Sequence, residues 1–287
     1  MADKARTGEL NLRKENVSRV VTGFALQNYL IKGLTMIQNS NSWKETYFRE
    51  TAADLTNSAS PVRGVPRLAN FPYGEVTFSE VSNRLEKYGM EGVISWEDAT
   101  TNEIGVIART LLRIGRAVAK AVDDKIYSDI SSEAGSTVTI TADSEWDSAT
   151  VANRDPIQNI LDAKRLIAEN NYNPDQGGAL LINPKDYANL LGNANVRNAG
   201  QFWTDTATRN GRVGMIVGLT VVVTNSVTAD EAMVGILKEA VTWQQAKSLT
   251  VETITDPGIK WTIRAWEVGV PQVTNPDALC KISNTAA

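Results

Sequence analysis

The residues that could do chemistry in this chain are few, and they do not converge on one site. The 287 residues include no histidine and a single cysteine, Cys280. Without histidine the chain lacks the Ser-His-Asp and Cys-His mechanisms and the commonest metal ligand. A single cysteine excludes an internal disulfide and a zinc site built from several cysteines. We therefore expect no catalytic, cofactor or metal site, and a buried, inert thiol at Cys280.

Two further patterns resemble chemical motifs without completing them. Glycines recur between residues 211 and 218, but their spacing fits neither GxGxxG nor the P-loop, and no Lys-Ser/Thr pair follows. The adjacent carboxylates Asp123-Asp124 and Glu97-Asp98 could hold a hard cation or carry out acid–base chemistry. Neither pair has a set of further ligands beside it, so we interpret both as solvated or helix-capping residues.

Basic residues form a row along one predicted helix. Its members are Arg109, Arg113, Arg116 and Lys120, whose spacing of four, three and four residues places them on one face of a helix. Most rows of this kind are solvated helix faces, and Asp123 and Asp124 partly offset the charge of this one.

The bulk composition limits the other function classes. Hydrophobic residues make up 42% of the chain, enough to form one large core or two smaller ones. A net charge of −4 is not that of a general nucleic-acid binder, although it permits a local basic stripe. No apolar run approaches the roughly 18–20 residues that span a bilayer, and the N-terminal segment has no apolar region typical of a secretory signal.

The elements that would position these residues begin with a predicted helix over residues 17–36. It is either a core helix or an arm that packs on a neighbouring subunit. Residues 43–97 then predict a strand, a proline-containing loop and returning strands, with few core residues between them. An isolated two-stranded hairpin is marginal in water. We therefore favour a projecting hairpin that is stabilised on a neighbour over a flexible surface loop.

Residues 98–130 predict one long helix. Its apolar face is formed by Ile107, Leu111, Ile114, Val118 and Val122. After a surface hairpin or connector at 131–152, Asp155-Pro156 opens a second helix, and residues 179–182 predict a short buried strand before a third helix that ends near Gly192. This order indicates an α/β subdomain.

Three segments and the order of elements resemble one known family. The segments read LLINPKDYANL (180–190), VGLTVVVTNSV (217–227, with Thr220 where the family commonly has proline) and AMVGILKEAVTW (232–243). The chain resembles the major capsid proteins of tailed bacteriophages and viruses, which have the Hong Kong 97-type capsid fold. This resemblance implies an α+β fold with these parts: an N-terminal arm (1–43), an E-loop (44–80), a P-domain (81–150 and 255–287) with a spine helix at about 100–130, and an A-domain (151–254).

The resemblance also implies the function. Copies of the chain would form pentamers and hexamers and close an icosahedral shell around a packaged double-stranded DNA genome, with no enzymatic activity and no cofactor. The location would be the virion capsid, and the host cytoplasm during assembly. Partners would be the chain itself, a portal protein, non-specifically bound DNA, and separate scaffolding or decoration proteins as further candidates, but no membrane. The spine helix would face inward, so the row from Arg109 to Lys120 would contact DNA.

Aromatic residues are the candidate anchors between subunits, because large rings dominate interface energetics. They are Phe24, Tyr29, Trp43, Phe48, Phe71 and Tyr73, and the alternative is that some belong to the subunit's own core. No lysine lies between Lys44 and Lys87, so the loop tip cannot supply the isopeptide bond of some relatives. We therefore predict a non-covalent lattice, or one held by an additional protein. Only about forty residues precede Trp43, so we expect no internal scaffolding segment and no cleavage.

Two other interpretations stay open. An encapsulin-like shell has the same fold but encloses cargo enzymes, and the long, proline-containing loop at 44–80 makes us favour a virus. An α/β enzyme that uses carboxylates is a more distant alternative, because the chain has no histidine and no converging motif.

Overall fold

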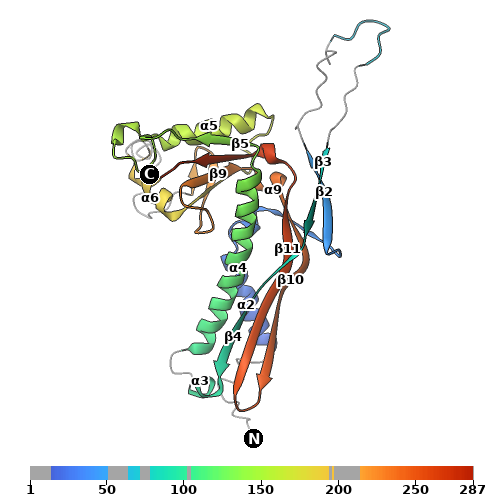
Figure 1. Ribbon diagram of the computed structural model, residues 1–287, viewed down its shortest axis with the longest axis vertical. Helices are drawn as coiled ribbons and strands as arrows, with labels where there is room; N and C mark the ends of the chain where they lie inside the picture. Colours follow the sequence, from blue (N-terminus) through green and yellow to red (C-terminus); the bar gives the residue numbers. More distant parts are fainter. Residues whose placement is uncertain are drawn as a thin grey trace. The chain divides into compact units, whose positions relative to one another are not determined.

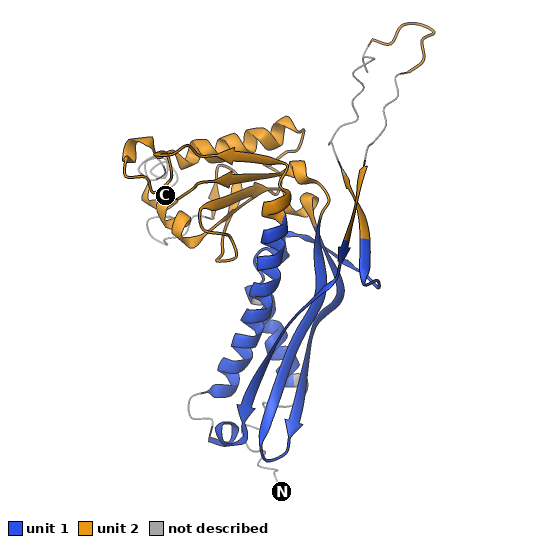
Figure 2. Ribbon diagram, viewed as in Figure 1, with its two compact units in different colours: residues 1–45, 83–129, 242–272 blue, residues 46–82, 130–241, 273–287 orange. Residues whose placement is uncertain are grey.

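The computed structural model describes residues 14–50, 64–71, 78–101, 105–193, 196 and 214–286. The chain divides into two compact units (Figure 2). Unit 1 comprises residues 1–45, 83–129 and 242–272, and unit 2 comprises residues 46–82, 130–241 and 273–287.

Unit 1 is a four-stranded sheet covered by helices (Figure 1). The strand order is β1 (Met36–Asn39), β10 (Val241–Asp256), β11 (Lys260–Val273) and β4 (Glu86–Ser95). β1 pairs in parallel with β10, and β11 pairs antiparallel with β4. The helices are α2 (Lys14–Asn28), α3 (Trp96–Thr101), α4 (Val106–Glu133) and the short 3-10 helix η1 (Lys32–Leu34).

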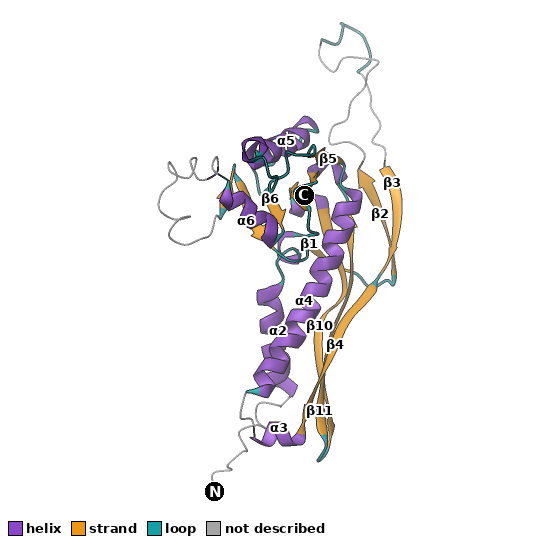
Figure 3. Cartoon of the chain, turned by 60° about the vertical axis from the view of Figure 1, so that its left-hand side comes forward, coloured by secondary structure: helices purple, strands orange, loops and turns teal. Residues whose placement is uncertain are grey.

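Helices α2 and α4 lie side by side in unit 1 (Figure 3). Their close approach depends on Gly115, where a Cβ atom would lie 3.2 Å from the backbone of Val21 and Ala25. The apolar face predicted for the long helix is confirmed, since its five residues from Ile107 to Val122 are at most 4% exposed. Val17 and Val21 of α2 pack in the same cluster, so α2 is a helix of the subunit's own core.

Two helix boundaries differ from the predictions. The segment expected to be one helix over 98–130 contains two helices. The first, α3, ends at Thr101, and the second, α4, begins at Val106. The helix expected over 17–36 ends at Asn28, and the chain continues through η1 into β1. In the segment between α2 and η1, backbone N–H groups donate to the carboxylate of Asp123, so this side chain replaces the carbonyl partners of a continuing helix.

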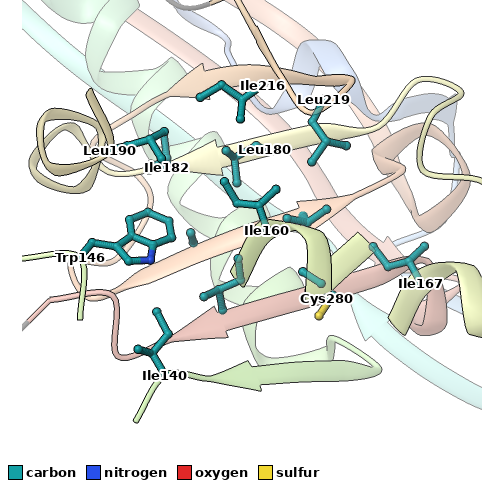
Figure 4. Packing of buried hydrophobic residues seen from close by; sticks show 14 residues of the cluster. Ile140, Trp146, Ile160, Ile167, Leu180, Ile182, Leu190, Ile216, Leu219 and Cys280 are labelled. Carbon is teal, nitrogen blue, oxygen red and sulfur yellow. The ribbon is translucent and has the colours of Figure 1, made fainter. Parts of the chain in front are cut away.

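Unit 2 is a six-stranded mixed sheet with its own core (Figure 4). The strand order is β5 (Ser136–Thr139), β12 (Leu279–Ser283), β9 (Glu231–Gly235), β6 (Ala179–Ile182), β8 (Leu219–Val223) and β7 (Met215–Ile216). The helical elements are α5 (Pro156–Glu169), α6 (Pro184–Gly192), α9 (Leu237–Ala240), η2 (Val151–Asn153) and η3 (Pro276–Ala278). Ile160 and Ile167 of α5 pack with Leu180 of the central strand.

In the middle of unit 2, the predicted buried strand and the predicted start of a helix are confirmed. All four residues of β6 are buried, as expected for a strand covered on both faces. Asp155 caps α5, because its side chain accepts a hydrogen bond from the Gln158 N–H, and Pro156 occupies the first turn. Residues 131–152 were expected to form a surface hairpin or a connector, and the hairpin is wrong because β5 pairs in parallel with the distant strand β12.

A separate two-stranded sheet consists of β2 (Lys44–Glu50) and β3 (Phe78–Arg84), which confirms the predicted strands on either side of the loop. The boundary between the two compact units lies between Val241 and Thr242. From there β10 runs unbroken to Asp256 in the sheet with β1 and β11. The assignment of capsid domain names to residue ranges stays a prediction.

Candidate assembly and nucleic-acid surfaces

A buried polar cluster fastens the segment after α2 to the rest of unit 1. We call Tyr29, Lys32, Asp123, Trp243 and Glu267 the arm-junction cluster. Glu267 is fully buried and forms an ion pair with Lys32. Its carboxylate also accepts hydrogen bonds from the Tyr29 hydroxyl at 2.5 Å and from the Trp243 indole N–H at 3.1 Å. A buried carboxylate is tolerated only when it is paired and hydrogen-bonded in this way.

Asp123 completes the arm-junction cluster from helix α4. Its carboxylate accepts backbone N–H groups of Leu30 at 2.8 Å, Ile31 at 3.3 Å and Lys32 at 3.0 Å. Burial raises the pKa of Asp123, while these hydrogen bonds act in the opposite direction. The pair of adjacent carboxylates on a helix predicts a solvated or helix-capping residue at this position. It is 2% exposed and holds a segment more than ninety residues away, so the solvated interpretation is wrong for Asp123.

The Lys32 ammonium is also placed against aromatic rings. It lies 4.5 Å from the centre of the Tyr29 ring and 5.4 Å from that of Trp243. Burial and the neighbouring Glu267 raise the pKa of the Tyr29 hydroxyl, which therefore keeps its proton and donates it. Sequence reasoning missed Lys32, Trp243 and Glu267, because each is an ordinary residue in its own segment and only the fold brings them together.

The β2–β3 hairpin has the opposite character, because its rings are exposed. Phe48 is 61% exposed and Phe78 53% exposed, and the two rings meet edge to face with centroids 6.2 Å apart. Trp43, just before β2, is 71% exposed. Tyr47 is the large apolar residue of β2 that is buried. This sheet thus presents aromatic surface without a core of its own.

The loop end of β2 is nonetheless fixed within unit 2. Arg49 forms an ion pair with Glu133 and donates to the backbone carbonyl of Val273 at 3.2 Å. It also donates to the Tyr47 hydroxyl at 3.3 Å. The exposed ring of Phe48 is therefore next to a strand end that the subunit itself holds.

The predicted anchors divide into two groups. Phe24 packs against the unit 1 core, and Tyr29 belongs to the arm-junction cluster, so both contact their own subunit. Trp43, Phe48 and Phe71 are exposed, the last at 85%. Tyr73 lies outside the described residues. A role in contacts between subunits stays a prediction for all six.

The predicted basic row lies on the exposed face of α4. Arg109, Arg113, Arg116 and Lys120 are all exposed, and at 1.5 Å per residue the row spans about 16 Å. Lys120 lies 2.6 Å from Asp124, which offsets its charge. Within the described ranges, none of the three arginines forms an ion pair, so they are the stronger candidates for phosphate contacts.

Two kinds of site are not found in the described part of the chain. Its His, Cys, Asp and Glu residues form no group of three or more that could hold a metal ion. Among the helices described, none is long and apolar enough to cross a membrane. Cys280 is fully buried, and burial raises the pKa of its thiol to about 11, as expected for an inert cysteine.

Comparison with known families identifies the class of protein. A family model described as "Phage capsid protein" matches residues 79–282, well over half of the chain. This chain therefore belongs to the phage capsid protein family. No curated protein sequence matches it.

Solved structures show the same fold at low sequence identity. The virus-like particle protein of Pyrococcus furiosus is 12% identical with a TM-score of 0.66, over 95% of this chain and all of that one. The capsid of the cyanophage P-SCSP1u is 16% identical with a TM-score of 0.65, over 87% of this chain and 86% of that one. The mature capsid of bacteriophage PhiM1 is 16% identical with a TM-score of 0.62, over 91% and 88%. The chain thus has the α+β Hong Kong 97-type capsid fold.

Family and fold together define a structural role. The protein is a capsid shell protein, and its place is the capsid of a virion. The exposed rings of the hairpin and the exposed arginines of α4 are the candidate surfaces for this role.

Proposed function

We propose that copies of this chain form pentamers and hexamers that close an icosahedral shell around a packaged double-stranded DNA genome. The observation that carries the proposal is the hairpin. In a member of the phage capsid family, it holds Phe48 and Phe78 exposed on a sheet of two strands. Such a sheet is marginal alone, and burial of its rings on a second copy would stabilise both.

The interface area required is large. A standard protein interface buries on the order of 1,600 Å² in total, and obligate interfaces bury more. The exposed aromatic residues around β2 and β3 would supply anchors for such an interface, with Trp43 and Phe48 as the leading candidates. Assembly would take place in the host cytoplasm, with a portal protein and separate scaffolding or decoration proteins as further partners.

The exposed arginines of α4 would face the packaged DNA. Contacts of Arg109, Arg113 and Arg116 with phosphates would be independent of sequence and would weaken with salt. The overall charge of −4 fits a protein that binds DNA through one local stripe and not through its whole surface.

Negative-stain electron microscopy of the purified chain, after size-exclusion chromatography at low and moderate salt, tests assembly. Closed shells, capsomer rings or tubes are the expected result. A chain that stays monomeric at every concentration and salt, alone and co-expressed with the scaffolding proteins of its source, contradicts the proposal.

Charge reversal tests the DNA surface. Shells of Arg113→Glu/Arg116→Glu should retain less nucleic acid per subunit than wild-type shells, and the loss should grow with salt. Arg165→Glu/Lys238→Glu makes the same charge change at exposed residues of unit 2 and serves as the matched control. Equal nucleic-acid content in both variants would show that α4 does not contact the genome. Shells that contain protein instead of nucleic acid would favour an encapsulin-like compartment.

A further inference from the structure

An indole ring on the unit 1 sheet is flanked by two lysines. Lys87 of β4 and Lys247 of β10 each place their ammonium 5.3 Å from the centre of the Trp266 ring. Trp266 lies on β11 and pairs with Gly89 of β4, where a Cβ atom would lie 2.9 Å from the Trp266 Cβ. The glycine thus leaves room for the ring. We call Lys87, Lys247 and Trp266 the Trp–Lys site.

The Trp–Lys site lies on the sheet face that the helices do not cover (Figure 3). Gly92 of β4 faces α4, since a Cβ atom there would lie 2.6 Å from the side chain of Ile114. Lys87 is an odd number of residues from Gly92, so its side chain points to the opposite face. In β11, Ala265 packs in the same core cluster as Ile114, and the next residue, Trp266, therefore points away from α4 as well.

The ring is held in place by its own subunit. It is half-buried and packs against a small cluster formed by Leu85, Val268 and Val270. Both lysines of the site are exposed. The ring is therefore fixed before any partner binds, and the two ammonium groups beside it are accessible.

The positive charge of the site is not compensated. Within the described ranges, neither Lys87 nor Lys247 forms an ion pair. Glu91, an exposed acid on the same face of β4, is paired with Arg264 at 2.5 Å. The ring attracts each ammonium, but two like charges beside one ring repel each other. A carboxylate bound between them would remove this repulsion.

Two kinds of anionic partner could supply the negative charge, nucleic acid or protein. The exposed arginines of α4 lie on the helix side of unit 1 and, in the proposed function, face the packaged DNA. The Trp–Lys site lies on the opposite face of the same sheet. In a closed shell these two faces meet different surroundings, which favours a protein over the genome as the partner of the sheet face.

We propose that the Trp–Lys site binds an acidic segment of a separate partner protein on the outer surface of the shell. Carboxylates of that segment lie between the ammonium groups of Lys87 and Lys247, and its apolar atoms pack on the accessible edge of the Trp266 ring. The inference rests on the proposed function, because the outward direction of this face follows from α4 facing the DNA.

Binding of fluorescein-labelled octaglutamate, measured by fluorescence anisotropy on shells and on unassembled subunits, tests the site. Lys87→Gln/Lys247→Gln should weaken binding about threefold to tenfold, because two charge contacts are lost. Lys44→Gln/Lys238→Gln removes the same charge at two exposed lysines elsewhere and is the matched control, which should bind as the wild type does. Equal affinity of the two variants overturns the proposal.

The ring has a test of its own. Trp266→Leu keeps an apolar side chain on the small cluster and removes the indole that positions the lysines. Its affinity for octaglutamate should also fall, although both positive charges remain. Affinity equal to that of the wild type would mean that ordinary surface charge attracts the peptide, and it would overturn the proposal.

Two comparisons separate the other possible occupants. Labelled octathymidylate carries a similar charge, and it should bind more weakly than octaglutamate. Tighter binding that depends on Lys87 and Lys247 would make this a nucleic-acid site, and the proposal would be wrong. Octaglutamate that binds subunits but not shells would mean that a second copy covers the site, which overturns the proposal as well.

The wild-type chain in the same assays keeps the two proposals apart. If shells form around nucleic acid and octaglutamate binding does not depend on Lys87 and Lys247, the Trp–Lys site is wrong and the proposed function stands. If the chain forms no assembly under any of the conditions given above, the proposed function fails, and binding of octaglutamate to the subunits decides the site by itself.

Discussion

The arm-junction cluster and the β2–β3 hairpin differ in how their side chains are covered. Those of the cluster are paired within the subunit, whereas the rings of the hairpin are exposed. At the junction, Glu267 is fully buried, and its ion pair and hydrogen bonds all come from the same chain. In the hairpin, Phe48 and Phe78 are more than half exposed, and their rings meet edge to face. The junction is complete in one subunit, whereas the hairpin presents apolar surface that the subunit does not cover.

This difference teaches which parts of a shell subunit are formed before assembly. Polar groups taken out of water must be satisfied at once, since a buried unpaired charge costs several kcal/mol. Exposed rings carry no such penalty in a single subunit and gain their stabilisation only when a second surface covers them. Changes at the junction should therefore affect folding, and changes in the hairpin should affect assembly.

The largest effect is expected at Glu267. Glu267→Ala leaves the Lys32 ammonium buried without its carboxylate and should lower the free energy of unfolding of the unassembled subunit by about 3–5 kcal/mol. Arg264→Ala on the same strand breaks an exposed pair with Glu91 and should cost less than about 1 kcal/mol. Urea unfolding of both variants checks the comparison. If the two variants lost similar amounts of unfolding free energy, the buried network would contribute no more to stability than an exposed ion pair.

Two phenylalanines provide the next contrast. Phe24→Ala removes a half-buried ring from the unit 1 core and should lower the free energy of unfolding by about 2 kcal/mol. Phe48→Ala removes an exposed ring and should change it by no more than about 0.5 kcal/mol. The assembly assay should show the reverse order, with a higher critical concentration for Phe48→Ala. The comparison would be wrong if Phe48→Ala lowered the free energy of unfolding and left the critical concentration for assembly unchanged.

The smallest effect concerns the pH dependence at Asp123. Burial raises the pKa of this carboxyl in the folded chain above its unfolded value, so the folded state binds the proton more tightly. This group's contribution to stability is therefore greatest below its unfolded pKa and is lost as pH rises through the raised pKa. The Asp123→Asn variant has no titratable group at this position in that pH range. From urea midpoints at several pH values, the wild type should gain stability relative to Asp123→Asn as pH falls through that window, and the opposite slope would contradict the assignment.

Local pattern was sufficient for much of the fold. The face from Ile107 to Val122, the buried strand at 179–182 and the cap at Asp155 all follow from periodicity or capping chemistry within a few residues. The exposed arginines of α4 were predicted in the same way, because helical spacing determines which residues share a face.

The remaining features depend on contacts between distant segments. The end of α2 at Asn28 is set by Asp123, and the site of Glu267 is built by residues from both ends of the chain. Residues 131–152 were expected to form a surface hairpin or a connector, but their strand β5 pairs with β12 at the other end of the sequence. The positive φ of Leu68, +67°, was not predicted either, because leucine is not a residue that signals a positive φ.

Hydrogen–deuterium exchange of unassembled subunits and assembled shells tests the central comparison most directly. The account predicts that the backbone amides of residues 30–32 are protected in both states, because Asp123 already binds them in one subunit. Amides in β2, in β3 and at residues 64–71 should exchange quickly in the subunit and slowly in the shell. Equal exchange of the hairpin in the two states would contradict the claim that a second copy covers it.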